Sequence, residues 1–451
     1  MLQLILFFLY SIVFCYIVYK LKYCRDEDIK PFVFPLFFCI KLFFGFLFYM
    51  VYTYYYADRA TADMYKYFDD SKPLFECLIH DPSTFYQIVL KHDVSSSQAV
   101  FYLSQMNHWQ LGYHRQFENS HQIIILFNVL CRFFSFGQLL PHLVFINFLS
   151  FLGLVGIWKS FRLFFPHKKI YFLFPVFLVP SVLFWCSGLL KESLIVFVLG
   201  FFLHSFFSLL KSDNHRWKHI LCFVFFYFLL FQIKSYVAIA FLPMIVIGIA
   251  VRISNFRYVA ASFLVGCILI LGLGFGIQTI FPSINPSKAL NEKIYGFKEV
   301  MLAADPKSSF DIGSNEHMDT KDIIRLVPSS IAVCLFRPFP WEAKNPFTIL
   351  VVLENFFLWS CMLMSLRFFF KDKQYIRLQG IQVYCLLSIF CVVCILYFII
   401  GISSFNFGAM VRYKAPMLPF LFAYPIMLIS DKFVEKANNL KIIGLFSIKR
   451  S

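Results

Sequence analysis

Long apolar runs separated by polar links set the pattern of this chain. Because about 20 helical residues cross a hydrocarbon core of ~30 Å, such runs predict membrane-spanning helices. Eleven segments qualify, at residues 2–19, 31–56, 139–158, 169–187, 193–210, 219–233, 236–251, 258–281, 347–367, 378–400 and 413–430. The pattern predicts an all-α, polytopic integral membrane protein with about 11 transmembrane helices, in a range of about 10–13.

The polar links fall into two kinds that differ in charge. The short links, counted together with the C-terminal tail, hold 22 Lys and Arg against 7 Asp and Glu. These segments are residues 20–30, 159–169, 211–218, 252–257, 367–377 and the tail 431–451. The long links carry no basic excess, with 5 basic and 8 acidic residues in 57–120 and 8 of each in 282–346. Lys and Arg collect in cytoplasmic loops, so the short links are predicted inside and the long links outside. This orientation puts the N-terminus outside and the C-terminus in the cytoplasm.

One segment, residues 121–136, is only half apolar. Its longest apolar stretch, Ile123 to Cys131, is too short to span, and a crossing there would reverse the charge assignment of the first long link. We therefore predict an interfacial or re-entrant helix on the outer face. The predicted organisation is one integral-membrane domain, residues 1–451, with two extracytoplasmic loops that carry interfacial helices, residues 57–138 and 282–346.

Composition excludes several classes of protein. Of 451 residues, 60% are apolar and 15% are charged, whereas soluble domains are about 45–50% apolar and about 25% charged. A soluble multidomain enzyme is thereby excluded. The formal net charge of +16 would indicate a nucleic-acid partner in a soluble protein. Here most of that excess lies in the cytoplasmic links, so no nucleic-acid partner is expected.

The ionisable residues left inside or at the edges of the spans are the candidates for function, because charges at membrane depth are costly. They are Lys41, Arg132, Lys191, Lys234, Arg412 and Lys414, with the acids Glu192 and Glu354. All the cations except Lys41 fall at outer ends of spans or on the outer interfacial segment. Each alone suits a headgroup contact or an ion pair, such as Lys191 with Glu192. As a set they predict a phosphate or pyrophosphate site, because Arg binds phosphate as a planar fork and Lys as a point charge. Glu354 is expected to face a wet interior or to pair with a cation.

Two stretches around these cations indicate a built site. From Pro180 to Glu192, a Pro, a Trp and a Ser-Gly pair precede the charged residues, and such breaks free backbone groups that need a protein-lined or wet setting. The second stretch begins at Asn406 and contains Arg412 and Lys414. On a helix these two side chains diverge by about 200°, whereas an extended segment would turn both to one side. An interfacial anchor is the competing interpretation of this stretch.

Carboxylates near the level of the cations supply candidate catalytic groups. Asp63 and, after it, Asp58 follow closely on a span exit, where a carboxylate serves as general base toward an acceptor hydroxyl. A divalent metal ion bound through these oxygens is an alternative. In the second outer loop, Arg337 and Glu342 follow an amphipathic segment at residues 320–336. This pair either reaches the cavity or fixes the loop against the bundle.

The long acidic loop just after an early span, with Asp58 and Asp63, resembles the multi-span GT-C glycosyltransferases. Residues 184–192 and 406–416 resemble polytopic proteins of bacterial surface-polysaccharide clusters, to which O-antigen polymerases are related. The resemblance implies a bacterial inner-membrane enzyme that uses a polyprenyl-phosphate-linked sugar at the outer face, with an acidic base in its first outer loop. The chain departs from the best-known members in lacking an Asp-Glu or Asp-x-Asp pair after the early span.

The leading prediction is a membrane glycosyltransferase of cell-surface polysaccharide or glycolipid assembly. Its predicted partners are the lipid-linked donor, a glycan or lipid acceptor, and membrane lipids. Asp63 or Asp58 takes the acceptor proton, and the residues predicted to bind the donor phosphate are Arg412, Lys414, Lys191, Arg132, Lys234, Arg337 and Asn406. The alternative is a polymerase that moves a whole glycan between lipid pyrophosphates and needs the cations more than the carboxylates. A transporter or flippase comes third, because paired halves with interrupted helices are not visible in the sequence.

Overall fold

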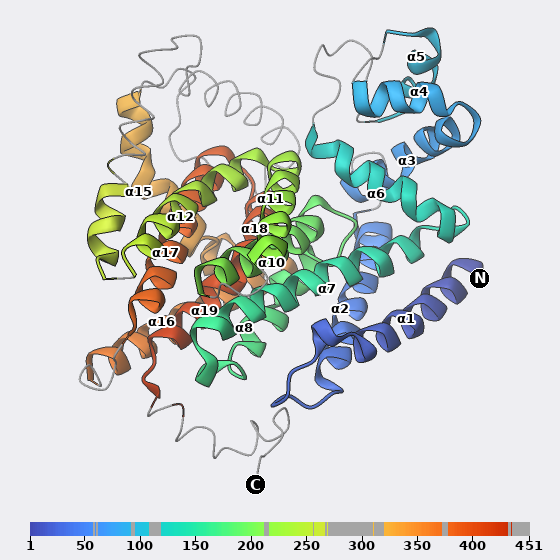
Figure 1. Ribbon diagram of the computed structural model, residues 1–451. Helices are drawn as coiled ribbons and strands as arrows, with labels where there is room; N and C mark the ends of the chain where they lie inside the picture. The colour runs from blue at the N-terminus through green and yellow to red at the C-terminus, as the bar shows by residue number, and fades with distance from the viewer. Residues whose placement is uncertain are drawn as a thin grey trace.

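A computed structural model of the chain describes residues 1–56, 59, 62–91, 95–107, 119–211, 216–255, 257–266, 268, 310, 320–371, 378–431 and 434. Its helices, in order, are α1 (Leu2–Lys20), η1 (Lys22–Cys24), α2 (Val33–Met50), η2 (Val51–Tyr55), α3 (Asp63–His80), α4 (Pro82–Tyr86), η3 (Gln87–Lys91), α5 (Ser97–Leu103), α6 (Asn119–Ser135), α7 (Leu139–Phe164), η4 (Pro166–Lys168), α8 (Leu173–Phe177), α9 (Pro180–Trp185), α10 (Lys191–Lys211), α11 (Arg216–Ile233), α12 (Ser235–Ile253), α15 (Thr320–Phe336), η5 (Pro340–Glu342), α16 (Pro346–Lys371), α17 (Gly380–Ser403), α18 (Phe407–Lys414), η7 (Ala415–Met417) and α19 (Leu418–Leu428). The all-α prediction is confirmed for the described residues (Figure 1).

Eight helices are long and apolar enough to cross a membrane, which supports a helical membrane protein: α1, α2 with η2, α7, α10, α11, α12, α16 and α17. The other three predicted spans differ. Residues 169–187 form two short helices, α8 and α9, because Pro180 lacks a backbone N–H and starts a new helix after extended Val179. Residues 413–430 contain the end of α18, the short helix η7 and the 11-residue helix α19. Residues 258–281 lie mostly outside the described part of the chain.

Contacts among described residues bring the short basic links together at one end of the bundle. Asp26 pairs with Arg162 and, at 3.0 Å, with Lys169, which joins the α1–α2 link to the α7–α8 link. Lys168 donates to the Ile429 carbonyl at 2.6 Å, near the C-terminal tail. Three more bonds lie at this end, from Lys211 to the Leu163 carbonyl, from Arg252 to the Leu210 carbonyl and from Gln382 to the Phe164 carbonyl.

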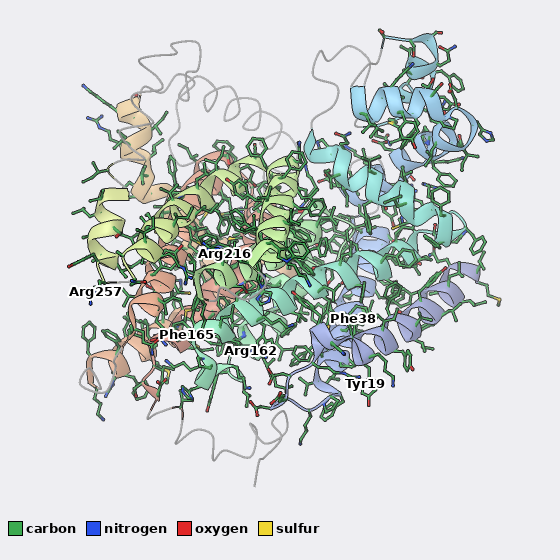
Figure 2. The ribbon with its side chains drawn as sticks, viewed as in Figure 1. Tyr19, Phe38, Arg162, Phe165, Arg216 and Arg257 are labelled. Carbon is green, nitrogen blue, oxygen red and sulfur yellow. The ribbon has the colours of Figure 1, made fainter. Side chains whose placement is uncertain are left out.

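Tyr19, Arg162 and Phe165, which lie on or beside two of these links, are toward the bottom of the view in Figure 2, while Arg216 and Arg257 of two other links lie at mid-height, Arg257 on the left. The ribbon in the same view is Figure 1. The charge pattern predicts that the short links share one side, and the contacts agree. That this side faces the cytoplasm stays a prediction from charge.

The first long link is helical where it is described, and its helices α3, α4, α5 and α6 lie at the opposite end (Figure 1). Helix α6 packs against α3 and α7. Its apolar part, His121–Ser135, is shorter than the helices that can span, in keeping with the predicted interfacial helix. The predicted amphipathic segment at 320–336 is helix α15, and it packs against α17.

The centre of the bundle is built on close contact between α7 and α10. Gly153 and Gly156 of α7 face Gly200 of α10, and a Cβ at any of the three would overlap the backbone of the other helix. Small residues let membrane helices approach closely, and packing then drives their association. This contact fixes the start of α10 relative to α7.

The predicted break ahead of Lys191 is confirmed, since α9 ends at Trp185 and α10 begins at Lys191. The break leaves backbone carbonyls without a helical partner, and these carbonyls accept hydrogen bonds from side chains, as membrane depth requires. Lys41 and Ser150 donate to the Cys186 carbonyl at 2.6 and 3.0 Å. Asn147 donates to the Ser187 carbonyl at 2.8 Å, and Ser193 donates to the Gly188 carbonyl at 2.7 Å. Lys41 therefore supports the break from within the bundle.

Candidate functional site

Four charged side chains from distant parts of the sequence form one continuous chain of ion pairs. Glu192 is fully buried, and its two oxygens accept from Lys234 Nζ at 2.8 Å and from Arg412 Nε at 3.0 Å. Arg412 also donates through Nη1 to Asp63 Oδ2 at 2.6 Å. We call Asp63, Arg412, Glu192 and Lys234, together with the neighbouring Lys191, the charged cluster.

Helix ends explain why these four residues meet. Asp63 and Glu192 lie in the first turns of α3 and α10, where the positive end of a helix dipole favours a carboxylate. Arg412 lies in the last turn of α18, where the negative end favours a cation, and Lys234 lies between the end of α11 and the start of α12, as the N-cap of α12. The cluster is thus a meeting point of helix ends.

Exposure is lowest at the centre of the chain of ion pairs. The side chain of Asp63 is 33% exposed, that of Arg412 12%, that of Glu192 0% and that of Lys234, at the far end, 8%. Asp63 is therefore the most exposed of the four ion-paired side chains, and Arg412 lies directly behind it. Lys191 interacts electrostatically with all four of the other members.

The cluster has donors to spare for an anion. Its three cations exceed its two carboxylates by one positive charge. Arg412 uses Nε and Nη1 for its two carboxylates, and its Nη2 has no hydrogen-bond partner among the described residues. A guanidinium has five N–H donors, so a phosphate oxygen can bind while both ion pairs remain.

Aromatic rings surround the charges. Lys234 lies 4.2 Å from the ring centroid of Tyr413, and Tyr52 and Tyr67 interact electrostatically with Arg412 and Asp63. A cavity of about 10 Å³, room for roughly one water molecule, lies against Lys234, Tyr236 and Tyr413.

A search among protein families, curated proteins and solved structures finds no match to this chain. The proposed function therefore rests on the geometry of the site.

Lys414 does not join the charged cluster. Residues Phe407–Lys414 form helix α18, so the extended alternative is wrong and Lys414 points away from Arg412. Its ammonium is buried and donates to the Cys334 carbonyl at 3.2 Å and to Asn355 Oδ1 at 3.4 Å. A phosphate bound to Arg412 would therefore lie on the face of α18 opposite to Lys414.

Two more predicted phosphate ligands have structural partners. Arg132 donates to Ser71 Oγ at 2.7 Å and to the Phe68 carbonyl at 2.6 Å, which fixes α6 to α3. Asn406 caps α18, because its Oδ1 accepts from the backbone N–H of Gly408 at 2.7 Å. This cap orients the helix that carries Arg412.

Arg337 pairs with Glu342 in the turn after α15, with Nε to Oε1 at 2.8 Å. Burial alone would raise the pKa of Glu342, but the Arg337 guanidinium and the Phe339 N–H outweigh burial and hold that pKa below its usual range. Arg337 also lies over the rings of Phe310 and Phe407. The pair fixes the loop against the bundle, the second of the two predicted alternatives.

Two predictions lie partly beyond the structure. Asp58 falls outside the described residues. Among the residues that are described, no three His, Cys, Asp or Glu side chains are grouped to hold a metal ion, so Asp63 stands here as an ion-paired carboxylate.

The sequence reasoning missed the central role of Glu192. It considered Glu192 only as a partner of its neighbour Lys191, whereas the structure pairs it with Lys234 and Arg412. The available signal was its position in the first turn after a helix break. Tyr413, whose ring centroid lies 4.2 Å from Lys234 Nζ and 5.9 Å from Arg412 Cζ, was also missed.

Proposed function

We propose that this protein is a membrane glycosyltransferase that takes a sugar from a polyprenyl-phosphate-linked donor at the outer face of a bacterial inner membrane. The observation that carries the proposal is the charged cluster, in which a partly exposed carboxylate adjoins buried cations with a net positive charge. A lipid-linked phosphate lies at this depth, and the acceptor approaches from the side of the outer loops.

The residues have distinct roles in this reaction. An acceptor hydroxyl oxygen attacks the anomeric carbon, the bond from that carbon to the phosphate oxygen breaks, and its electron pair stays on the phosphate. Arg412 and Lys191 hold the phosphate and stabilise the charge that develops there. Asp63 accepts the hydroxyl proton.

The ion pair between Arg412 and Asp63 links donor binding to base strength. A phosphate bound at Arg412 Nη2 shares the positive charge of the guanidinium with Asp63, which weakens the hold of that charge on Asp63 and makes Asp63 Oδ2 the stronger proton acceptor. Glu192 and Lys234 lie behind Arg412 and keep its orientation fixed. We therefore assign Glu192 and Lys234 as positioning residues and Asp63 and Arg412 as residues that touch the substrates.

The test is restoration of surface glycan in cells that lack the chromosomal gene. We expect the wild-type gene to restore the glycan, and Asp63→Asn and Arg412→Gln to fail at normal expression. The matched controls are Asp69→Asn and Arg59→Gln, since Arg59 and Asp69 form an exposed ion pair beside the same helix α3, at 2.5 Å. Both controls should restore the glycan.

Other outcomes separate the alternatives. If Asp63→Asn and Asp58→Asn both remain active while Arg412→Gln fails, a polymerase replaces the glycosyltransferase, because only the cations are then required. If Asp63→Asn and Arg412→Gln both restore wild-type glycan, the charged cluster is not the substrate site and the proposal is wrong.

A further inference from the structure

Four buried polar atoms without a hydrogen-bond partner among the described residues lie on α15, on α17 and its C-cap, and on the neighbouring α16. They are Ser404 Oγ, Ser330 Oγ, Tyr397 Oη and Glu354 Oε1. Each such atom destabilises the fold when it stays dry. Buried polar groups of this kind are usually satisfied by internal water. None of the four belongs to the charged cluster.

A seam runs between α15 and α17, which pack side by side (Figure 1). On α17, residues 397, 401 and 404 follow a spacing that puts them on one helix face. Gly401 lies against Ser330 of α15, where a Cβ would overlap the Ser330 carbonyl. Glycine at this position lets the two backbones approach while the hydroxyls above and below face the seam.

The outer end of the seam is at Ser404. Helix α17 begins near Gln382, which donates to the Phe164 carbonyl at the end of the basic links. Ser404 directly follows the opposite end of α17, the end that carries the charged cluster. The seam therefore starts on the side that the charge pattern assigns to the outer face.

The inner end of the seam is at Glu354. This residue lies eight positions after the start of α16, roughly 12 Å along the helix, and it is 6% exposed. Its Oε2 accepts from the backbone N–H of Ser181 at 2.8 Å, which leaves Oε1 for another partner. Tyr397 interacts electrostatically with Glu354, and Asn355, the next residue of α16, donates to the Phe336 carbonyl at the end of α15 at 3.5 Å.

Among the described residues, no cation forms an ion pair with Glu354. Lys414 of α18 is the nearby cation, but its ammonium bonds to Cys334 of α15 and to Asn355 instead. Tyr397 of α17 is the remaining titratable neighbour, and Tyr424 of α19 interacts with Cys385 and Cys394. A buried carboxylate without a paired charge is costly and takes up a proton instead.

We propose that Glu354 is a proton-binding site that exchanges protons with the outer face through water held in the α15–α17 seam. A hydronium ion in the seam gives one proton to Glu354 Oε1 and becomes water, and the Oε1–H then donates a hydrogen bond along the seam. Ser404, Ser330 and Tyr397 supply the polar partners that each water needs. This site is separate from the charged cluster and does not depend on the glycosyltransferase proposal.

Infrared spectroscopy of the full-length protein in lipid vesicles tests the site. The wild type should show a carbonyl band from a protonated, buried carboxyl group, and Glu354→Gln should lose it. Glu342→Gln is the matched control, because Glu342 is ion-paired with Arg337 and should not contribute to the band. A wild-type protein without such a band, or a band that survives Glu354→Gln, would overturn the proposal.

Exchange into heavy water tests the seam separately. On transfer to D₂O the band should shift in the wild type as Glu354 exchanges its proton for deuterium. Tyr397→Phe and Ser404→Val keep the carboxyl group but remove the polar partners, so the exchange should slow several-fold. Exchange as fast as in the wild type in both variants would show that protons reach Glu354 by another route and would contradict the seam.

Discussion

At the scale of single residues, Lys234 and Arg412 both pair with the fully buried carboxylate of Glu192. The loss of this carboxylate should therefore cost much of the protein's stability. Lys234 has Glu192 as its ion-pair partner, whereas Arg412 also has Asp63. Breaking a buried pair by removing one partner costs about 3–5 kcal/mol, because the other charge stays buried and uncompensated. An exposed pair contributes far less, typically under about 1 kcal/mol.

We therefore expect Glu192→Gln to lower the free energy of unfolding by about 3–5 kcal/mol. The control is Asp69→Asn, which breaks the exposed pair with Arg59 and should cost under about 1 kcal/mol. Chemical unfolding of the purified protein in detergent, followed by circular dichroism, measures both. Equal losses in the two variants would mean that Glu192 is not the buried centre of the cluster.

Single residues also show how far sequence reasoning reaches. Arg412, Lys234 and Asp63 were predicted as site residues because their charges lie at span ends, and the structure brings them together. Arg132 and Lys414 were chosen on the same ground, but carbonyl and hydroxyl partners on other helices bind them. Such partners depend on tertiary packing, which the charge pattern does not contain.

At the scale of elements, two local breaks position the site. The break between α9 and α10 was predictable because Pro180 and the Ser-Gly pair leave a strong local signal. The conformation of α18 was not, since the sequence allowed a helix or an extended segment. Asn406 decides it, because its side chain caps the helix, and this separates Arg412 from Lys414.

The contact between α7 and α10 yields a prediction about the elements themselves. Gly200→Ala should destabilise the protein by about 1–3 kcal/mol or more, since the added methyl meets the Gly153 backbone, which cannot move aside as a side chain can. Ala250→Val, which adds more volume at an exposed position of α12, is the control and should be nearly neutral. Thermal unfolding in detergent compares the two, and a neutral Gly200→Ala would show that the helices are further apart than described.

At the scale of the whole molecule, the charge pattern proved the most informative part of the sequence. Five short links and the C-terminal tail, which share a basic excess, were predicted to lie on one side, and contacts such as Asp26 with Arg162 gather described parts of them at one end. The number of membrane-spanning helices was predicted less exactly, because a hydrophobic run does not reveal that residues 169–187 form two short helices. The net charge of the chain thus reports orientation, while the few charges at the other end form the site.

The central claim is that the charged cluster binds a lipid-linked phosphate, and direct binding tests it most plainly. Purified protein is titrated with undecaprenyl phosphate and, separately, with undecaprenol, which lacks the phosphate. We expect the wild type to prefer the phosphate, and Arg412→Gln to lose at least about tenfold in affinity, about 1.4 kcal/mol. Arg412→Lys should lie between them, since it keeps the charge without the planar fork.

The matched control is Arg59→Gln, which removes an exposed guanidinium from the same end of the molecule and should bind as the wild type does. If undecaprenyl phosphate and undecaprenol bind the wild type equally, or if Arg412→Gln binds the phosphate as tightly as Arg59→Gln, the cluster does not hold a phosphate and the account is contradicted.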